Sequence, residues 1–346
     1  MDDESGYGPA DAARRAEVMA LPVVRVRHHA HLVAPRPGDV RLCASVGPSG
    51  EVVALWSKAE DLSALRSVTV GSGGAAFPDS RALRPVGAQV TVHVPDTAVV
   101  TEIAGLTVAF PTVQPLPGDR VLVVGARCRW LPGGPERNAV VYGPDGAVLG
   151  ERTLGDGIEH VLTSRRGEVW VGYFDEGVHG NRGWGFGGDE PLGEWGLNRF
   201  SPDLARTWHY PQHAVAAWGA IDDCYALNVH GDTAWVCYYC DFPIVRIHDG
   251  AVTGWHNDVR GARALVVGNS RVALYGGYGP DHDRLVTGVL DGDRFHVTGE
   301  HRLVQPDGQP LPAATQVFGR GPDLHLLTED TWWRLALEDV PTGSAR

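Results

Sequence analysis

Two short stretches of the chain, "GIEHVL" and "AIDDCYAL", each contain a pair of ionisable residues near their start. The pairs are Glu159 with His160, and Asp222 with Asp223. Carboxylates that converge from equivalent positions can hold a divalent cation such as Ca²⁺, which accepts several oxygen ligands, or act as a general acid and base. They can also do no more than hydrogen-bond neighbouring strands. All four are candidate catalytic residues, and Glu159 and Asp222 are also the candidate ligands of one divalent metal, calcium or a similar ion.

A long insertion, residues 175–196, follows the first stretch and is rich in glycine, tryptophan and acidic residues. Glycine allows the backbone to approach a ligand closely, and an indole offers a large apolar face with one donor. The same tryptophans can instead anchor the loop to its own strands, and the sequence favours neither role. The candidate ligand-binding residues of the insertion are Asp175, Glu176, Asn181, Trp184 and Trp195. Tyr239 and Asp241, at the equivalent position of the next repeat, complete this set.

The elements that must position these residues repeat along the chain. "WVGYFDEGV" (170–178) resembles "WVCYYCDFPI" (235–244), because each has a Trp-Val pair, then an aromatic pair, then acid. Downstream, "LNRFSPDLARTW" (197–208) matches "IVRIHDGAVTGW" (244–255), a strand that enters a polar turn and returns to a tryptophan. Weaker copies flank both units. Each copy predicts four short strands, and consecutive four-stranded units are typical of the blades of a β-propeller.

We therefore predict an all-β chain with one β-propeller domain over residues 23–340, most simply of six four-stranded blades. Five or seven blades stay open, because the first unit is long and loosely patterned. The last unit shows only three clear strands, and an apolar segment at 23–34 has no partner. Pairing the two would close the ring and remove exposed sheet edges. Residues 1–22 are expected to form an extension, either a short helix or disordered, and 341–346 a tail.

This repeat architecture resembles the six-bladed propeller families, among them the NHL-repeat, gluconolactonase-like and strictosidine-synthase-like proteins. The resemblance implies the fold and a loop-rich face at the mouth of a central channel, where both acidic pairs and the insertion would converge. It rests on architecture alone, so it implies no role for any single residue.

Composition excludes several classes of function. The formal net charge of −12 argues against nucleic acid as a partner, because phosphate contacts need clustered cations. Lys58 is the one lysine, which leaves lysine-based chemistry a single candidate. No apolar run approaches the roughly 18 residues of a membrane helix. Five cysteines at irregular spacing and no secretory segment lead us to expect a cytoplasmic protein.

Three classes of function remain. The favoured one is a small-molecule site at the channel mouth, as in a metal-dependent hydrolase, lactonase or lyase. The second is a non-catalytic ligand-binding or sensing module that uses the same cleft, since aromatic and polar groups also describe a recognition pocket. The third is a scaffold for protein partners. Fold alone does not decide among them.

Overall fold

The computed structural model describes residues 8–70, 74, 76–95, 97–185 and 189–342. The chain divides into two compact units, which we describe separately. Unit 1 comprises Met1–Leu32, Ala217–Gly219 and Tyr225–Arg346. Unit 2 comprises Val33–Ala216 and Ala220–Cys224.

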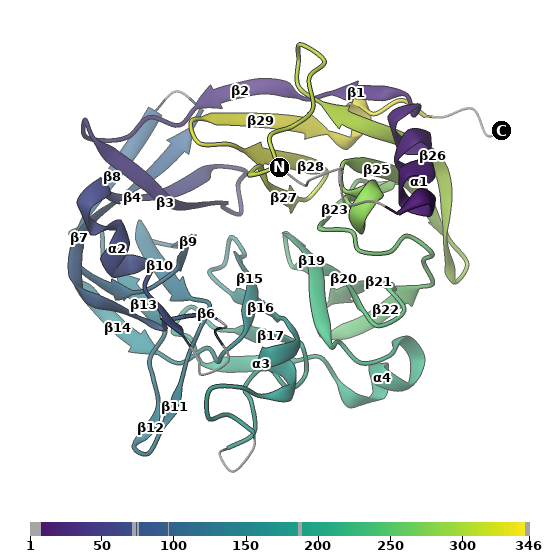
Figure 1. Ribbon diagram of the computed structural model, residues 1–346. Helices are drawn as coiled ribbons and strands as arrows, with labels where there is room; N and C mark the ends of the chain where they lie inside the picture. The colour runs from purple at the N-terminus through teal and green to yellow at the C-terminus, as the bar shows by residue number, and fades with distance from the viewer. Residues whose placement is uncertain (1–7, 71–73, 75, 96, 186–188, 343–346) are drawn as a thin grey trace. The chain divides into compact units, whose positions relative to one another are not determined.

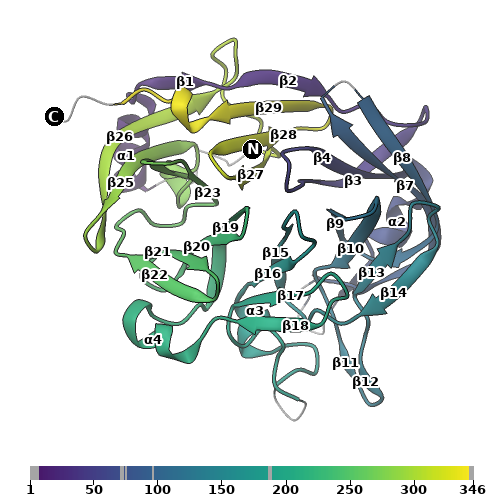
Figure 2. The same cartoon turned by 180° about the vertical axis from the view of Figure 1, so that it is seen from behind.

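Unit 2 contains three antiparallel four-stranded sheets in which strand order follows chain order. The first is β3 (Asp39–Val46), β4 (Val52–Lys58), β7 (Arg81–Val94) and β8 (Thr97–Val108). The second is β9 (Pro111–Leu116), β10 (Arg120–Gly125), β13 (Ala139–Tyr142) and β14 (Val148–Arg152). The third is β15 (Ile158–Thr163), β16 (Val169–Tyr173), β17 (Leu197–Phe200) and β18 (Arg206–His209), labelled together in Figure 2.

The connection between the second and third strands carries extra elements in all three sheets of unit 2. Between β4 and β7 lie a 3-10 turn, η2 (Ala59–Asp61), the helix α2 (Leu62–Leu65) and the hairpin of β5 (Val68–Val70) and β6 (Ala76–Pro78). Between β10 and β13 lies a hairpin of β11 (Trp130–Leu131) and β12 (Gly134–Pro135). The helix α3 (Asp175–His179) follows β16. These connections supply most residues of the site described below.

Unit 1 contains three further sheets. The first is β19 (Asp223–His230), β20 (Thr233–Tyr239), β21 (Ile244–His248) and β22 (Ala251–Trp255), of which β19 starts in unit 2. The second is β23 (Ala264–Val267), β24 (Val272–Tyr275), β25 (Arg284–Asp291) and β26 (Arg294–Val304), extended by β1 (Val23–Arg25) parallel to β26. The third is β27 (Gln316–Arg320), β28 (Asp323–Leu327), β29 (Thr331–Ala336) and β2 (Arg27–His31). The short η3 (Gly279–Asp281) and η4 (Leu337–Asp339) follow β24 and β29.

Six sheets of consecutive antiparallel strands are the blades of a six-bladed β-propeller, so the predicted fold class and blade number are confirmed. The N-terminal strand β2 pairs antiparallel with β29, with Arg27 opposite Arg334, and Figure 1 shows the purple strand along the yellow one. That this pairing closes a ring stays a prediction, as do the domain bounds 23–340.

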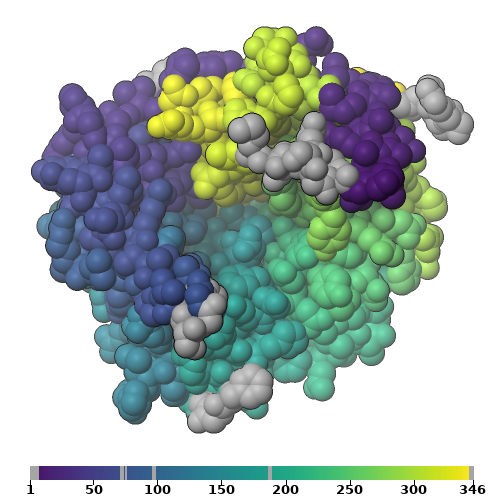
Figure 3. Space-filling model, in the orientation of Figure 1, coloured from purple at the N-terminus to yellow at the C-terminus, as the bar shows by residue number. Residues whose placement is uncertain are grey.

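The N-terminal extension contains one helix, α1 (Pro9–Met19), and α4 (Gln212–Trp218) precedes β19. Figure 3 shows α1, in purple, on the yellow-green surface of the C-terminal strands. Residues 1–7 of the expected extension and 343–346 of the expected tail lie outside the described residues. No helix in the described part of the chain combines the length and the apolarity that a membrane crossing requires.

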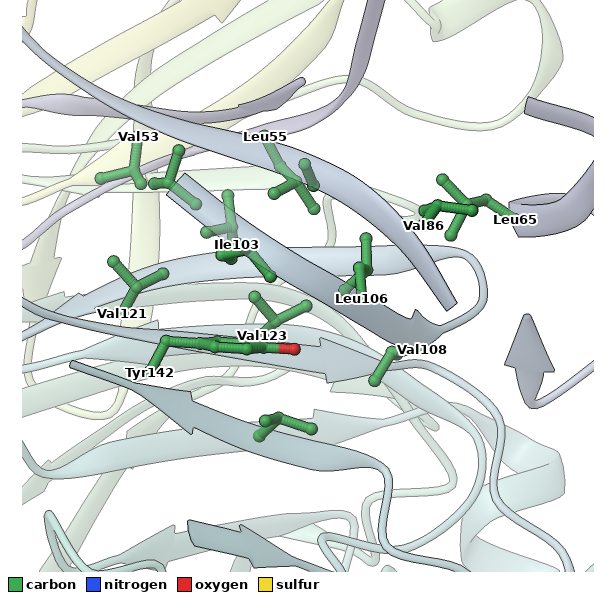
Figure 4. Close-up of a cluster of buried hydrophobic side chains, with 14 of the residues drawn as sticks. Val53, Leu55, Leu65, Val86, Ile103, Leu106, Val108, Val121, Val123 and Tyr142 are labelled. Carbon is green, nitrogen blue, oxygen red and sulfur yellow. The ribbon is translucent and has the colours of Figure 1, made fainter. Parts of the chain in front are cut away.

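The strands form where β-branched and apolar residues alternate or run continuously, and their packing builds the core. In β4 every residue from Val52 to Ser57 is buried, as expected for a strand covered on both faces. The largest cluster of unit 2 joins its first two sheets, with Leu55, Ile103, Val123 and Tyr142 pointing toward one another (Figure 4). A matching cluster in unit 1 includes Leu303, Leu326 and Leu335. These rigid sheets hold the loops that carry the candidate site.

Candidate functional site

Three carboxyl groups of unit 2 gather where two inner strands begin. Asp223 is the first residue of β19, Glu159 the second of β15, and Asp175 the first of α3. Asp223 is half-buried, and its pKa rises to about 6, first because burial disfavours the charged form and then because of the negative charges of Glu159 and Asp175. The structure therefore brings together three of the predicted residues: Glu159 and Asp223 from the ionisable pairs, and Asp175 from the insertion.

Local backbone features place Glu159 and Asp175 near each other. The pairing of β15 with β16 shifts register between Ile158 and His160, so Glu159 is the extra residue of a β-bulge. A bulge redirects a side chain, and bulges are frequent beside active sites. Gly157 and Gly177 pack backbone against backbone, and a Cβ on either would collide with the other segment. Two glycines at this contact therefore allow α3 to lie against the start of β15.

The other two members of the predicted catalytic set lie beside this cluster. Asp222 Oδ1 is 3.4 Å from His179 Nε2, a histidine that the sequence analysis did not single out. His160 lies opposite Gly172 in the sheet, and its Nε2 is buried without a hydrogen-bond partner among the described residues. The described chain brings no three His, Cys, Asp or Glu side chains close enough to hold a metal ion. Metal binding by Glu159 and Asp222 stays a prediction.

Glu176 is engaged in a buried ion-pair network, which the sequence did not reveal. Its Oε2 is 2.5 Å from Arg127 Nη2, and Arg127 also makes two hydrogen bonds to Asp156, of 2.8 and 3.0 Å. The guanidinium of Arg127 is 5.4 Å from the centre of the Phe174 ring. A buried, bidentate pair of this kind is costly to break. Glu176 therefore fastens α3 to the segment after β10, whereas Asp175, in the same turn of the helix, accepts a 2.7 Å hydrogen bond from the Glu176 backbone N–H.

The two tryptophans of the insertion differ in role. Trp184 is 3% exposed, and its Nε1 donates to the Cys128 carbonyl oxygen at 2.9 Å. Its ring meets Trp130 edge to face at 4.8 Å. Trp184 is therefore an anchor of the loop, and almost none of its ring is available to a ligand. Trp195 is partly exposed and stacks on His209 at 5.1 Å.

A pocket of about 510 Å³ lies between the three extra connections of unit 2. Its lining includes Phe77, Arg129, Trp130, Leu131, Asn181 and Arg182. Of the predicted ligand-binding residues, Asn181 alone lines it. Phe77 and Leu131 are exposed apolar side chains, and burial lowers the pKa of Arg182, with Arg127 and Arg129 adding to this. The pocket can accept an apolar group bordered by cations. The "LPGGP" stretch (131–135), which forms the turn of the β11–β12 hairpin, is the sequence signal that would have drawn attention to it.

The remaining two predicted residues belong to unit 1. Tyr239 is half-exposed, and its ring lies 5.8 Å from that of Phe242. Phe242 in turn contacts Tyr225 and Tyr278, which are joined by a 2.7 Å hydrogen bond between their hydroxyls. Asp241 is exposed, with a positive φ of 39°. Ligand binding by Tyr239 and Asp241 stays a prediction.

Comparison with known proteins yields one family model, the YxzG family, which matches residues 212–271. No curated protein matches the chain. Among solved structures, catalytically inactive virginiamycin B lyase from Staphylococcus aureus, with quinupristin, is 10% identical with a TM-score of 0.44, over 90% of this chain and 99% of that one. AztD from Citrobacter koseri is 12% identical, with a TM-score of 0.39, over 82% and 80% of the two chains. The β-propeller domain of Cps50 (Swd1) from Myceliophteria thermophila is 8% identical, with a TM-score of 0.46, over 90% and 100%. None of these likenesses assigns a role to a residue of this chain.

Proposed function

We propose that the protein is an enzyme that acts on a small molecule by acid–base catalysis, with Asp223 as the general acid. The observation that supports this most strongly is the pKa of Asp223, raised to about 6 by burial and by two neighbouring carboxylates. A general acid works best when its pKa lies near the working pH, because it must hold a proton and still release it. When two neighbouring carboxyl groups have different surroundings, their pKa values move apart, and the group with the higher pKa can serve as the acid.

Glu159 is the partner that this proposal requires. It is exposed at the bulge of β15 and interacts with Asp223 through its charge, and in this proposal it accepts a proton while Asp223 donates one. Proton delivery to a leaving group and proton removal by a nearby base serve both hydrolase and lyase reactions. The neighbouring pair of Asp222 and His179 offers a further titratable partner at the same edge.

The aromatic pocket of unit 2 supports the proposal from the substrate's side. Its exposed Phe77 and Leu131 offer apolar contact, and Arg182 borders it with a charge. Segments that line the pocket flank the acids along the chain: Glu176, next to Asp175, pairs with Arg127, and Arg129, two residues farther, lines the pocket. A substrate with an apolar portion and a polar reacting group would suit both parts.

The test is a comparison of Asp223→Asn, Glu159→Gln and a control, Glu190→Gln, an exposed acid of the same loop outside the cluster. Lactones, esters and sugar acids are assayed first, because hydrolase, lactonase and lyase reactions act on such compounds. We expect Asp223→Asn to lower kcat about 100- to 10,000-fold, and activity of the natural protein to fall as pH rises above about 6. Glu159→Gln should move that fall to lower pH, because it removes a charge that raises the pKa of Asp223. Full activity in Asp223→Asn would refute the assignment, as would a carboxyl titration by NMR that places Asp223 near 3.8.

The same acids favour a second candidate function, binding of a divalent cation. Within the described ranges, no lysine or arginine pairs with Glu159, Asp175 or Asp223. Because no three of these side chains in the described residues lie close enough to share one metal ion, a cation would bind one or two of them and take its other ligands from water, and its charge would offset the repulsion among all three. Calcium would then raise the melting temperature by mass action, and elemental analysis would find it in the purified protein. Glu159→Gln should abolish the calcium-dependent rise. An unchanged melting temperature in millimolar calcium would exclude this candidate and leave the metal-free acid–base site.

A further inference from the structure

A second pocket, of about 620 Å³, lies wholly within unit 1. It is bordered by the end of β19, by β20 and β21, and by the turns that follow β23 and β27. It shares no residue with the Asp223 site, so its function can be tested independently. Its lining includes three arginines and two acids, although the chain as a whole carries a net charge of −12.

Arg246 is held over two indole rings at the edge of this pocket. It lies opposite Trp235 in the pairing of β20 with β21. Its guanidinium carbon is 5.9 Å from the centre of the Trp235 ring and 5.8 Å from that of Trp255, and the two rings stack at 5.7 Å. No carboxylate pairs with Arg246 in the part of the chain that the structure describes. Cation–π contacts hold the side chain in position while its hydrogen-bond donors stay available.

Arg271 is a second cation without a carboxylate partner. Its Nη1 donates to the backbone oxygens of Val340 at 2.9 Å and Leu337 at 3.4 Å. Its Nε and Nη2 are buried, and neither has a hydrogen-bond partner among residues 8–70, 74, 76–95, 97–185 and 189–342. A buried charge with unsatisfied donors is unfavourable unless a counter-charge is supplied. An anion in the pocket would supply one.

The other charged groups that line the pocket do not neutralise the positive charges of Arg246 and Arg271. Arg334 is paired with Asp323, at 2.7 Å between Nη2 and Oδ2. Glu338 lines the pocket but is exposed to solvent. His230 also lines the pocket and is exposed. Three arginines thus face two carboxylates, one of which is already paired.

We propose that this pocket binds a small molecule that carries an oxyanion, either a carboxylate or a phosphate group, with Arg246 and Arg271 as its cationic contacts. Guanidinium groups present several donors in a plane, which suits both kinds of oxyanion. Trp235 offers an apolar face beside them for the rest of the molecule.

Binding of inorganic phosphate and of citrate is measured by calorimetry at constant ionic strength, set with sodium chloride. The variants are Arg246→Gln and a control, Arg260→Gln, an exposed arginine of the same unit outside the pocket. We expect one of the two anions to bind, at least tenfold more weakly in Arg246→Gln and unchanged in Arg260→Gln. The indole NMR signal of Trp235 should shift on addition of the same anion. Which anion binds distinguishes a phosphate ligand from a carboxylate.

Three results would overturn the proposal: neither anion binding, equal binding in Arg246→Gln and the natural protein, or equal loss in both variants. The last would mean attraction to surface charge in general. Arg271→Gln is a further variant that should also weaken binding. If it fails to fold, because Leu337 and Val340 lose their donor, the Arg246 comparison still decides the matter.

Discussion

Trp184 and Cys128 are joined by a 2.9 Å hydrogen bond from the indole Nε1 to the backbone carbonyl, across 56 residues of the chain. The bond ties the insertion after β16 to the segment after β10, in the neighbouring sheet of unit 2. Trp130 closes over the same indole edge to face. The buried indole therefore holds the two segments together in two ways: its one donor is satisfied by the Cys128 carbonyl, and its ring packs against Trp130. The aromatic pocket depends on this attachment, since Trp130 lines it directly.

Replacing Trp184 by smaller side chains should lower the stability of the protein, and more so for alanine than for phenylalanine. Trp184→Phe keeps an aromatic ring but leaves the Cys128 carbonyl unpaired, and we expect a loss of about 1–2 kcal/mol in the free energy of unfolding. Trp184→Ala also removes the ring and should cost about 3–5 kcal/mol. Urea denaturation measures both. Trp195→Phe serves as the control, because Trp195 is partly exposed. An Ala variant within 0.5 kcal/mol of the natural protein would show that the ring is not an anchor.

Much of the fold can be predicted from the sequence, because blade architecture is expressed locally. The Trp-Val strands at 170 and 235 and the turns between strands mark each blade through residue type and spacing alone. The elements inserted between the strands were harder to predict from the sequence. Helix α3 and the β11–β12 hairpin form because neighbouring segments support them, as when Arg127 pairs with Glu176. Such support depends on contacts between distant parts of the chain.

The site was predictable to a similar extent. The pair Glu159 and His160 holds the same position in its repeat as Asp222 and Asp223 in the next, and that equivalence alone indicated that the two pairs converge. The bulge at Glu159 and the close approach of Gly157 to Gly177 have no signature in residue type. The role of Trp184 was equally undecidable, because whether an indole is buried depends on its tertiary neighbours.

The stability of the protein should depend on pH through the titration of Asp223. Its pKa is about 6 in the folded protein against 3.8 ordinarily, so the folded state retains a proton that the unfolded state loses. The resulting stabilisation is complete below pH 3.8 and is lost as pH rises through 6. Asp223→Asn should therefore gain melting temperature relative to the natural protein between pH 4 and pH 7. Glu190→Gln should show no such trend, and parallel curves for Asp223→Asn would mean that the carboxyl is not perturbed.

A buried histidine should make the protein sensitive to acid. Burial, followed by Arg334 and Arg320, lowers the pKa of His325 to about 3 from 6.5, and its Nδ1 accepts a 3.1 Å hydrogen bond from Trp332 Nε1. Below pH 6.5 His325 is protonated in the unfolded chain, whereas in the folded chain it stays neutral until the pH approaches 3. This contribution to stability is present above pH 6.5 and declines as pH falls toward 3.

The variant His325→Gln keeps an acceptor for Trp332 but does not titrate. Its free energy of unfolding, measured in urea from pH 7 to pH 4, should fall less steeply than that of the natural protein. His296→Gln, at an exposed position of the same unit, should follow the natural curve. Equal slopes for all three proteins would assign the acid sensitivity to other groups.

The N-terminal helix α1 is held by a buried ion pair, and that pair should decide whether the helix stays in place. Arg15 donates from Nη1 and Nη2 to the two carboxylate oxygens of Asp283, at 2.6 and 3.1 Å, and also to the Pro280 carbonyl oxygen. Both side chains are almost fully buried. Removing Arg15 leaves the buried Asp283 with the longer contact to Arg302, at 3.9 Å, and breaking a buried pair of this kind costs about 3–5 kcal/mol. A terminal helix can avoid that cost by detaching, without unfolding the sheets.

Arg15→Met should therefore expose the backbone amides of α1 after Pro9 to hydrogen exchange, while the melting temperature changes little. Arg14→Gln is the matched control, since Arg14 is more exposed than Arg15 and its pairs with Glu17 and Asp281 are open to solvent in part. Should exchange in α1 stay as slow in Arg15→Met as in Arg14→Gln, the apolar contact of the buried Val18 would be sufficient to hold the helix. Fast exchange in Arg15→Met alone would show that the ion pair, and not the apolar face, fixes α1 to its unit.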